Sequence, residues 1–147
     1  MIKINYPNFS FKIKGEQINA AIFDEIRKQW VKLLPEEWVR QNFIQFLLQE
    51  MHYPASLIAV EKEIKLGSLS KRCDLIVYNN QAPWMLIECK APKINISEET
   101  LLQALRYHQS VPVPFICLTN GTQVYLFEKQ NQQFTEINEF PKWGNNS

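Results

Sequence analysis

Two apolar stretches decide the fold: residues 72–78 read RCDLIVY and residues 84–90 read WMLIECK. Both have apolar side chains at odd and at even positions, which is typical of strands that are covered on both faces and lie in the middle of a sheet. A third β-like stretch, residues 57–65, comes before them. The two linkers are short and contain Gly, Asn or Pro, so we expect an antiparallel meander of three strands.

A helix is predicted over residues 35–51. Pro35 stands in its first turn, and the acidic residues directly after it suit the positive end of the helix dipole. Tyr53-Pro54 ends the helix. One stripe of this helix is apolar and would face the sheet: Val39, Phe43, Phe46 and Leu47.

A second helix, residues 97–110, is expected to begin with Ser97 as its N-cap, and residues 115–119 resume as a strand. A strand, a helix and a strand in this order predict a parallel crossover. Asn120-Gly121 is a hairpin signal that pairs 115–119 with 123–127. The predicted fold class is therefore α/β, with a mixed sheet built from an antiparallel meander, a crossover helix and a parallel strand, and flanked by helices.

The length of 147 residues fits a single domain, which we assign to 1–147 with a core of about 20–127. Residues 9–14 alternate apolar and polar side chains, which predicts an edge strand that Gly15 ends. The tail after Asn131 is polar and irregular, and we assign no element to it. Both ends are expected to be peripheral.

Composition excludes several classes of protein. Sixteen Lys and Arg against fifteen Asp and Glu give a net charge of +1, which argues against a broad cationic surface. The three cysteines have no close pair, fit neither a disulfide framework nor a CxxC zinc site, and indicate a reducing compartment. The N-terminus lacks the apolar stretch of a signal peptide, and the longest apolar run, 111–118, is far short of the ~18 residues of a membrane span. We therefore expect a cytoplasmic protein that does not contact a membrane.

Glu88 and Lys90 are ionisable residues where the pattern predicts apolar ones. They share one face of their strand, being two residues apart, and Asp74 lies near the same end of the neighbouring strand. Burial of three unpaired ions would cost several kcal/mol each. Two carboxylates and the backbone carbonyl of Cys89 are oxygen ligands that suit Mg²⁺, and Lys90 would stand beside a metal-bound water. This combination favours phosphodiester hydrolysis, because cations offset the charge that grows in the transition state.

The chain contains a second Glu-x-Lys, Glu63-Ile64-Lys65, with no aspartate on a preceding strand, and we assign that copy to solvent. The plain alternative for Glu88 and Lys90 is an exposed salt bridge at a strand end. Thiol chemistry by Cys89 with His108 is disfavoured, because Cys89 alternates away from the face of Glu88. The position of His108 near a helix C-terminus is explained by the helix dipole alone.

Asp74 followed by Glu88-Cys89-Lys90 resembles the bipartite signature of the PD-(D/E)XK nuclease superfamily, and Gln103 with Tyr107 resembles the QxxxY motif of one branch of it. More of the chain is similar to one family within it, the N-terminal nuclease domain of type I restriction enzyme R proteins. Further matching stretches are PEEWVRQ at 35–41, Tyr53-Pro54, KRCD at 71–74, IECKAP at 87–92 and LTNG at 118–121.

The resemblance implies a restriction-endonuclease-like fold and a role for each matching residue. Asp74 and Glu88, together with the Cys89 carbonyl, would hold Mg²⁺, or Mn²⁺ in its place. Lys90 would orient or activate the attacking water. Gln103 and Tyr107 would position the phosphate backbone or the lysine. A glutamate on the first helix would complete the site, for which we select Glu37, with Glu50 as the alternative.

The implied function is that of a Mg²⁺-dependent deoxyribonuclease in restriction-modification. Arg40, Arg72 and Lys93 are candidate DNA phosphate contacts, with ordinary surface salt bridges as the alternative for the two arginines. DNA is the expected partner, together with a separate helicase or specificity subunit or a second copy of the chain, since no Walker motif is present. The alternative function is a catalytically idle DNA-binding or assembly module on the same fold.

Overall fold

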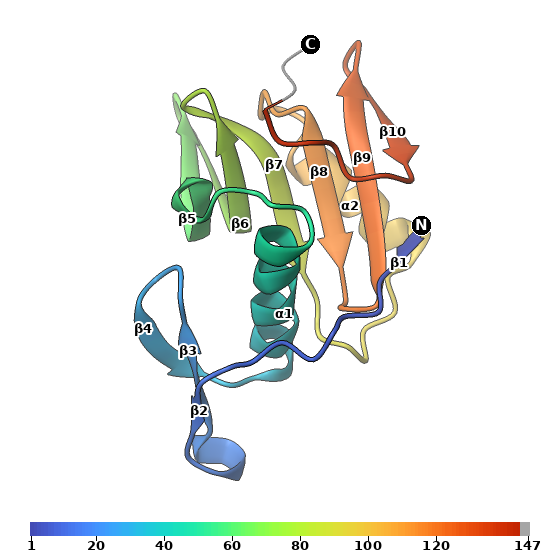
Figure 1. Cartoon of the computed structure of the whole chain (residues 1–147). Coiled ribbons are helices and arrows are strands. Elements are labelled where there is room, and N and C mark those ends of the chain that lie inside the picture. The colour runs from blue at the N-terminus through green and yellow to red at the C-terminus, as the bar shows by residue number, and fades with distance from the viewer. Residues whose placement is uncertain (145–147) are drawn as a thin grey trace.

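The computed structural model describes residues 1–144 and contains a seven-stranded mixed sheet with two α-helices, one on each face (Figure 1). The strand order is β1-β9-β8-β7-β6-β5, and β10 also pairs with β9. Only β7 and β8 run parallel, and every other pair in this sheet is antiparallel. The mixed α/β class is therefore confirmed. The last three residues of the predicted tail, 145–147, lie outside the described residues.

The meander consists of β5 (Ile58–Leu66), β6 (Leu69–Asn79) and β7 (Ala82–Cys89), as predicted. The link between β6 and β7 is tighter than expected. Asn79 pairs with Ala82, so only Asn80 and Gln81 form the turn, and both have positive φ angles. Two consecutive residues of positive φ are typical of a type I′ hairpin, whose twist matches that of the flanking strands.

The crossover predicted after the meander is also confirmed. The second helix, α2 (Glu98–Tyr107), begins after Ser97, whose hydroxyl accepts a hydrogen bond from the amide of Thr100. β8 (Phe115–Thr119) then pairs in parallel with β7 and antiparallel with β9 (Gln123–Gln130). These connections place β7 and β8 in the middle of the sheet, where their side chains are covered on both faces.

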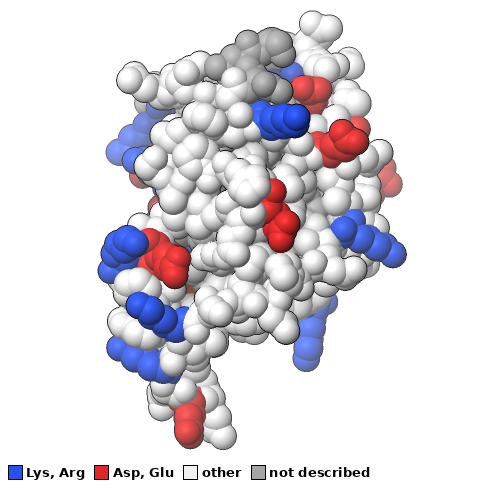
Figure 2. Space-filling model, viewed as in Figure 1, with Lys and Arg blue, Asp and Glu red and all other residues white. Residues whose placement is uncertain are grey.

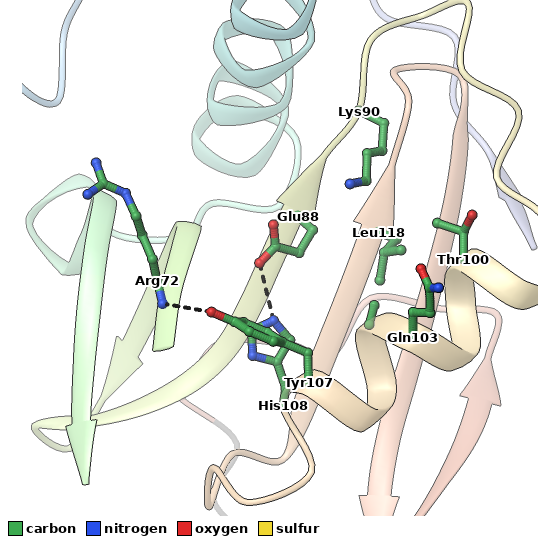
Figure 3. A pocket seen from close by; sticks show the side chains of 9 residues that line it. Arg72, Glu88, Lys90, Thr100, Gln103, Tyr107, His108 and Leu118 are labelled. Carbon is green, nitrogen blue, oxygen red and sulfur yellow. Dashed lines mark hydrogen bonds and ion pairs between the residues drawn. The ribbon is translucent and has the colours of Figure 1, made fainter. Parts of the chain in front are cut away.

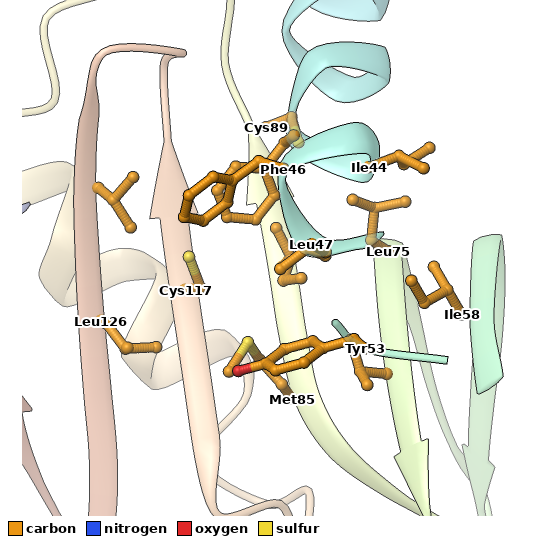
Figure 4. Close-up of a cluster of buried hydrophobic side chains, with 14 of the residues drawn as sticks. Ile44, Phe46, Leu47, Tyr53, Ile58, Leu75, Met85, Cys89, Cys117 and Leu126 are labelled. Atoms are coloured by element: carbon orange, nitrogen blue, oxygen red, sulfur yellow. The ribbon is translucent and has the colours of Figure 1, made fainter. Parts of the chain in front are cut away.

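The first helix, α1 (Pro35–Gln49), packs on one face of the sheet (Figure 1). Its apolar stripe contacts Leu75, Met85 and Cys117, which point to this face from three adjacent strands (Figure 4). The helix is buried on its polar side as well, because the N-terminal segment covers it. The buried polar residues of α1 are Glu37, Arg40, Gln41, Asn42 and Gln45.

The opposite face of the sheet packs against α2. Ile76, Leu86 and Leu118 point to this side and form a smaller core with partly buried residues of α2, among them Leu105. Because this helix is short and none of its residues is fully buried, a pocket remains between it and the sheet.

A small antiparallel sheet of β2 (Ile13–Lys14), β3 (Ala21–Asp24) and β4 (Gln29–Lys32) lies beside the start of α1 (Figure 1). The strand predicted at 9–14 is therefore wrong for most of its length. Phe9 and Phe11 pack as aromatic contacts instead, the latter against Trp38 with ring centroids 5.2 Å apart. The predicted end of the strand at Gly15 is confirmed, since this residue has a φ of 77°.

Two strands on one edge of the main sheet were not predicted. β1 (Ile2–Lys3) and β10 (Gln133–Ile137) both pair with β9, at opposite ends of it. Two 3₁₀ turns, Gln17–Asn19 and Ala55–Leu57, complete the regular structure.

Charged side chains are scattered over the face seen in Figure 2, with one acidic group near its middle and several blue groups at the lower left. This agrees with the net charge of +1. None of the helices described is both long and apolar enough to span a membrane.

Candidate active site

Two of the carboxylates predicted from the sequence lie side by side at one end of the meander. β6 and β7 pair with Leu75 opposite Ile87, so the next position along places Asp74 opposite Glu88. The backbone amide of Cys89 donates a hydrogen bond to Oδ2 of Asp74 over 2.7 Å. The short linker thus brings both acids to the same strand end, as the sequence predicted.

The positive charge near Asp74 and Glu88 is not enough to keep the pKa of Asp74 at its usual value. Burial and the neighbouring Glu88 carboxylate raise the pKa of Asp74 from 3.8 to about 7, although the Cys89 amide and Arg40 lower it in part. The guanidinium of Arg40 remains 4.0 Å from Oδ1 of Asp74. Two adjacent, partly buried carboxylates are a donor set that a divalent cation stabilises, so the residues present fit Mg²⁺.

Glu88 and Lys90 line one pocket of about 390 Å³, whereas Cys89 points to the opposite face, into the core beneath α1. The amide of Lys90 donates to the carbonyl of Thr119 over 2.8 Å, which extends the β7–β8 pairing by one residue and fixes where the lysine points. Figure 3 shows its amino group extending toward Glu88. In the described part of the chain Lys90 forms no ion pair, so its charge is available to a ligand.

The other wall of the pocket is the face of α2 that carries Gln103 and Tyr107 (Figure 3). The hydroxyl of Tyr107 accepts a hydrogen bond from the amide of Arg72 over 3.4 Å, and the ammonium of Lys71 lies 4.1 Å from its ring centroid. Tyr107 therefore ties α2 to β6, and Gln103 faces the pocket one turn earlier. Both predicted motif residues lie beside Glu88 and Lys90.

His108 is a site residue that sequence reasoning missed. It is fully buried at the end of α2, and its Nε2 lies 3.2 Å from Oε1 of Glu88. The helix dipole explained its position in the sequence, but only the crossover shows that this helix end meets Glu88 near the end of β7. The one available signal was that His108 directly follows Tyr107 of the motif.

The first turn of α1 carries a buried ionic network that extends toward Asp74. Glu37 contacts Arg40 at 3.5 Å and Arg27 at 3.3 Å, and Arg40 also contacts Glu61 at 3.0 Å. Glu37 therefore reaches Asp74 through Arg40. Its alternative, Glu50, ends the same helix at the far side and lines a different pocket with His52 and Trp143.

The three candidate phosphate contacts differ in exposure. The Arg40 side chain is only 6% exposed and faces four carboxylates, which does not favour a contact with DNA. The Arg72 side chain is 71% exposed and lines the pocket. Lys93 is exposed in the segment between β7 and α2.

Comparison with known proteins gives one family. The family described as type I restriction enzyme R protein N terminus (HSDR_N) matches residues 35–141, which is well over half of the chain. The match includes α1, the meander, α2 and the strands up to β10, and so every residue of the acid pair and its pocket. No curated protein matches the chain significantly.

Proposed function

The chain belongs to the family of type I restriction enzyme R protein N termini, and from this premise we propose that it is a Mg²⁺-dependent endonuclease domain that hydrolyses phosphodiester bonds in DNA. We further propose that its fold is the restriction-endonuclease-like fold of the PD-(D/E)XK superfamily. The family indicates a role in restriction and an assembly of several subunits. A separate helicase or specificity subunit, or a second copy of the chain, is the partner we propose.

The observation that carries this proposal is the meeting, at one end of β6 and β7, of two carboxylates and a lysine that has no ion-pair partner among the described residues. Asp74 and Glu88 adjoin each other, and Glu88 shares a solvent-open pocket with Lys90. An ordinary surface salt bridge would not need the two acids to be half-buried and adjacent. A carboxyl group whose pKa is raised by burial and by a neighbouring acid, as for Asp74 beside Glu88, is typical of functional sites.

Each residue has a proposed task. Asp74, Glu88 and the backbone carbonyl of Cys89 would hold the cation, which when bound lowers the pKa of a water and offsets charge on the phosphate. Lys90 would hold the attacking oxygen or a phosphate oxygen by hydrogen bonding from its ammonium. Gln103 and Tyr107 would orient the DNA backbone along the opposite wall of the pocket.

The distribution of charge suggests how DNA would approach. Arg72 on β6 and Lys93 in the segment after β7 are both exposed, and we propose that they contact phosphates. We propose for Arg40, in contrast, that it positions Asp74 and Glu37 instead of binding DNA, because four acidic side chains surround it.

A cleavage assay tests the proposal. Linear, circular and single-stranded DNA are incubated with the protein in Mg²⁺ or Mn²⁺, beside Lys90→Ala and, as a matched control, Lys65→Ala from the second Glu-x-Lys. We expect cleavage that falls by about 100-fold or more in Lys90→Ala and is unchanged in Lys65→Ala. Binding of DNA without lysine-dependent cleavage would favour the idle binding module.

A further inference from the structure

We propose that Cys73, Glu88 and His108 form a second metal site, which takes a transition-metal ion such as Zn²⁺ and shares Glu88 with the proposed Mg²⁺ site. Zinc bound there would remove Glu88 from the acid pair, so the two ions would exclude each other. The zinc site itself stands on geometry alone, while its inhibitory effect rests on the proposed function.

The three donor atoms come together from separate parts of the fold. The Cys73 thiol, a Glu88 carboxylate oxygen and a ring nitrogen of His108 all lie within 4.8 Å of one another. They belong to β6, to β7 and to the end of α2. Folding of the crossover onto the meander thus assembles the set.

Burial and access suit a bound ion. Cys73 is 1% exposed and His108 is 0% exposed, so two of the donors are shielded from water. Glu88 and His108 also line the 390 Å³ pocket, which gives an ion a path to the site without opening the core. A shielded site with an entry path is what a specific metal site requires.

His108 supplies an independent observation. The imidazole is fully buried, yet its Nδ1 has no hydrogen-bond partner among the described residues, and its one polar contact is with Glu88 at 3.2 Å. A buried polar group without a partner is costly in a purely structural role. The polar contact of the His108 ring is therefore with Glu88, which is another of the three proposed ligands.

Donor chemistry separates the two sites. A thiolate, an imidazole and a carboxylate prefer Zn²⁺ and related ions, with a fourth position left for water. The pair of Asp74 and Glu88 offers oxygen atoms alone, which prefer Mg²⁺. The side chain of Asp74 instead accepts the Cys89 amide, so Asp74 is not needed for zinc.

The test uses the intact chain, with Zn²⁺ affinity measured by competition with a chelator and with Co²⁺ as the spectroscopic probe. Cys73→Ser and His108→Gln should each weaken Zn²⁺ binding by at least about tenfold. Cys73→Ser should also abolish the thiolate-to-cobalt charge-transfer absorption. The matched controls are Cys117→Ser, a buried cysteine on the other face of the sheet, and His52→Gln, an exposed histidine, and neither should change the affinity.

Charge-transfer absorption that persists in Cys73→Ser would overturn the proposal, as would Zn²⁺ binding equal to wild type in both variants. Wild-type protein gives a further test that needs no variant, because Mg²⁺ in excess should displace Co²⁺. Co²⁺ that stays bound with unchanged affinity while Mg²⁺ saturates its own site would show that the two ions do not compete for Glu88.

The variant Asp74→Asn separates this inference from the proposed function. We expect it to lose Mg²⁺ binding and to keep Zn²⁺ binding. Zn²⁺ binding in a wild-type protein that never binds Mg²⁺ would refute the proposed nuclease function and leave the second site standing. Mg²⁺ binding without Zn²⁺ binding would refute the second site alone.

Discussion

The chain carries the pattern Glu-x-Lys twice, and the two copies have different surroundings. In Glu63-Ile64-Lys65 on β5, the edge strand, both charged residues are exposed, and Glu63 accepts a hydrogen bond from Ser70. In Glu88-Cys89-Lys90 at the end of β7, a central strand, both are half-buried in a pocket. The middle residue is buried in each copy.

The Glu-x-Lys pattern by itself determines only that its glutamate and lysine share one face of a strand. Whether those side chains form a site depends on the neighbouring strands and the helix above them. β7 lies between β6, which supplies Asp74, and β8, with α2 covering its face. β5 has a neighbour on one side only, so Glu63 and Lys65 remain in water.

The largest expected effect concerns the buried ionic network that lies beside Glu88-Cys89-Lys90. Arg40→Gln removes the guanidinium that lies near Asp74, while Glu37 keeps its contact with Arg27. Because Asp74 then stays half-buried without that cationic neighbour, we expect the free energy of unfolding to fall by about 3–5 kcal/mol. Arg72→Gln is the matched control, because both arginines contact Glu61 but the Arg72 side chain is 71% exposed. Its cost should stay below about 1 kcal/mol. Urea denaturation measures the free energy of unfolding of both variants. Equal losses would show that the buried network around Arg40 adds no more stability than the exposed contact of Arg72.

The next largest effect is a pH dependence of the free energy of unfolding. We expect it from the surroundings of Glu88-Cys89-Lys90 and not from those of Glu63-Ile64-Lys65. The pKa of Asp74 is raised from 3.8 to about 7, so the folded chain binds its proton more tightly than the unfolded chain does. Without metal, the free energy of unfolding should therefore fall as the pH rises from about 4 to about 7 and then level off. Asp74→Asn should remove that part of the slope, whereas Glu63→Gln should not.

Metal binding should show the opposite trend with pH. The cation needs the ionised carboxylate, so the apparent Mg²⁺ affinity should weaken by about tenfold for each pH unit below 7. Calorimetric titrations at several pH values measure this. An affinity that is constant from pH 6 to 8 would show that the titration of Asp74 is not coupled to the metal.

The smallest expected effect is on DNA binding. With Arg72 and Lys93 as the exposed candidate contacts and a net charge of +1, we expect weak binding with little sequence preference. Each of Arg72→Ala and Lys93→Ala should reduce the slope of log affinity against log salt by about 1, while Lys65→Ala should not. Fluorescence anisotropy with Ca²⁺ in place of Mg²⁺ measures the slopes. Nanomolar binding of one sequence at physiological salt would show that the chain carries a sequence-recognition element and would contradict this expectation.

The main sheet was predictable where local signals agree. Apolar side chains on both faces predicted β6 and β7, the Ser97 cap predicted the start of α2, and Asn120-Gly121 predicted the β8–β9 hairpin. β10 was missed because most of its side chains are exposed and polar. Its turn, Asn131-Gln132, repeats the Asn80-Gln81 dipeptide and likewise has two positive φ angles, which is the signal that could have indicated it.

The site was predictable only in part, for a physical reason. Asp74, Glu88 and Lys90 stood out as charges in apolar strands, and a short hairpin fixes their proximity. His108 and Arg27 reach the same region from a helix end and from the N-terminal segment. No spacing along the chain encodes such contacts, because they depend on how whole elements pack.

The most direct test of the central claim is a calorimetric Mg²⁺ titration of four proteins: wild type, Asp74→Asn, Glu88→Gln and Glu63→Gln. We expect wild type and Glu63→Gln to bind Mg²⁺ alike, and Asp74→Asn and Glu88→Gln not to bind it. Binding that survives in both Asp74→Asn and Glu88→Gln, with folding confirmed by circular dichroism, would contradict the assignment of a metal centre to the end of β7.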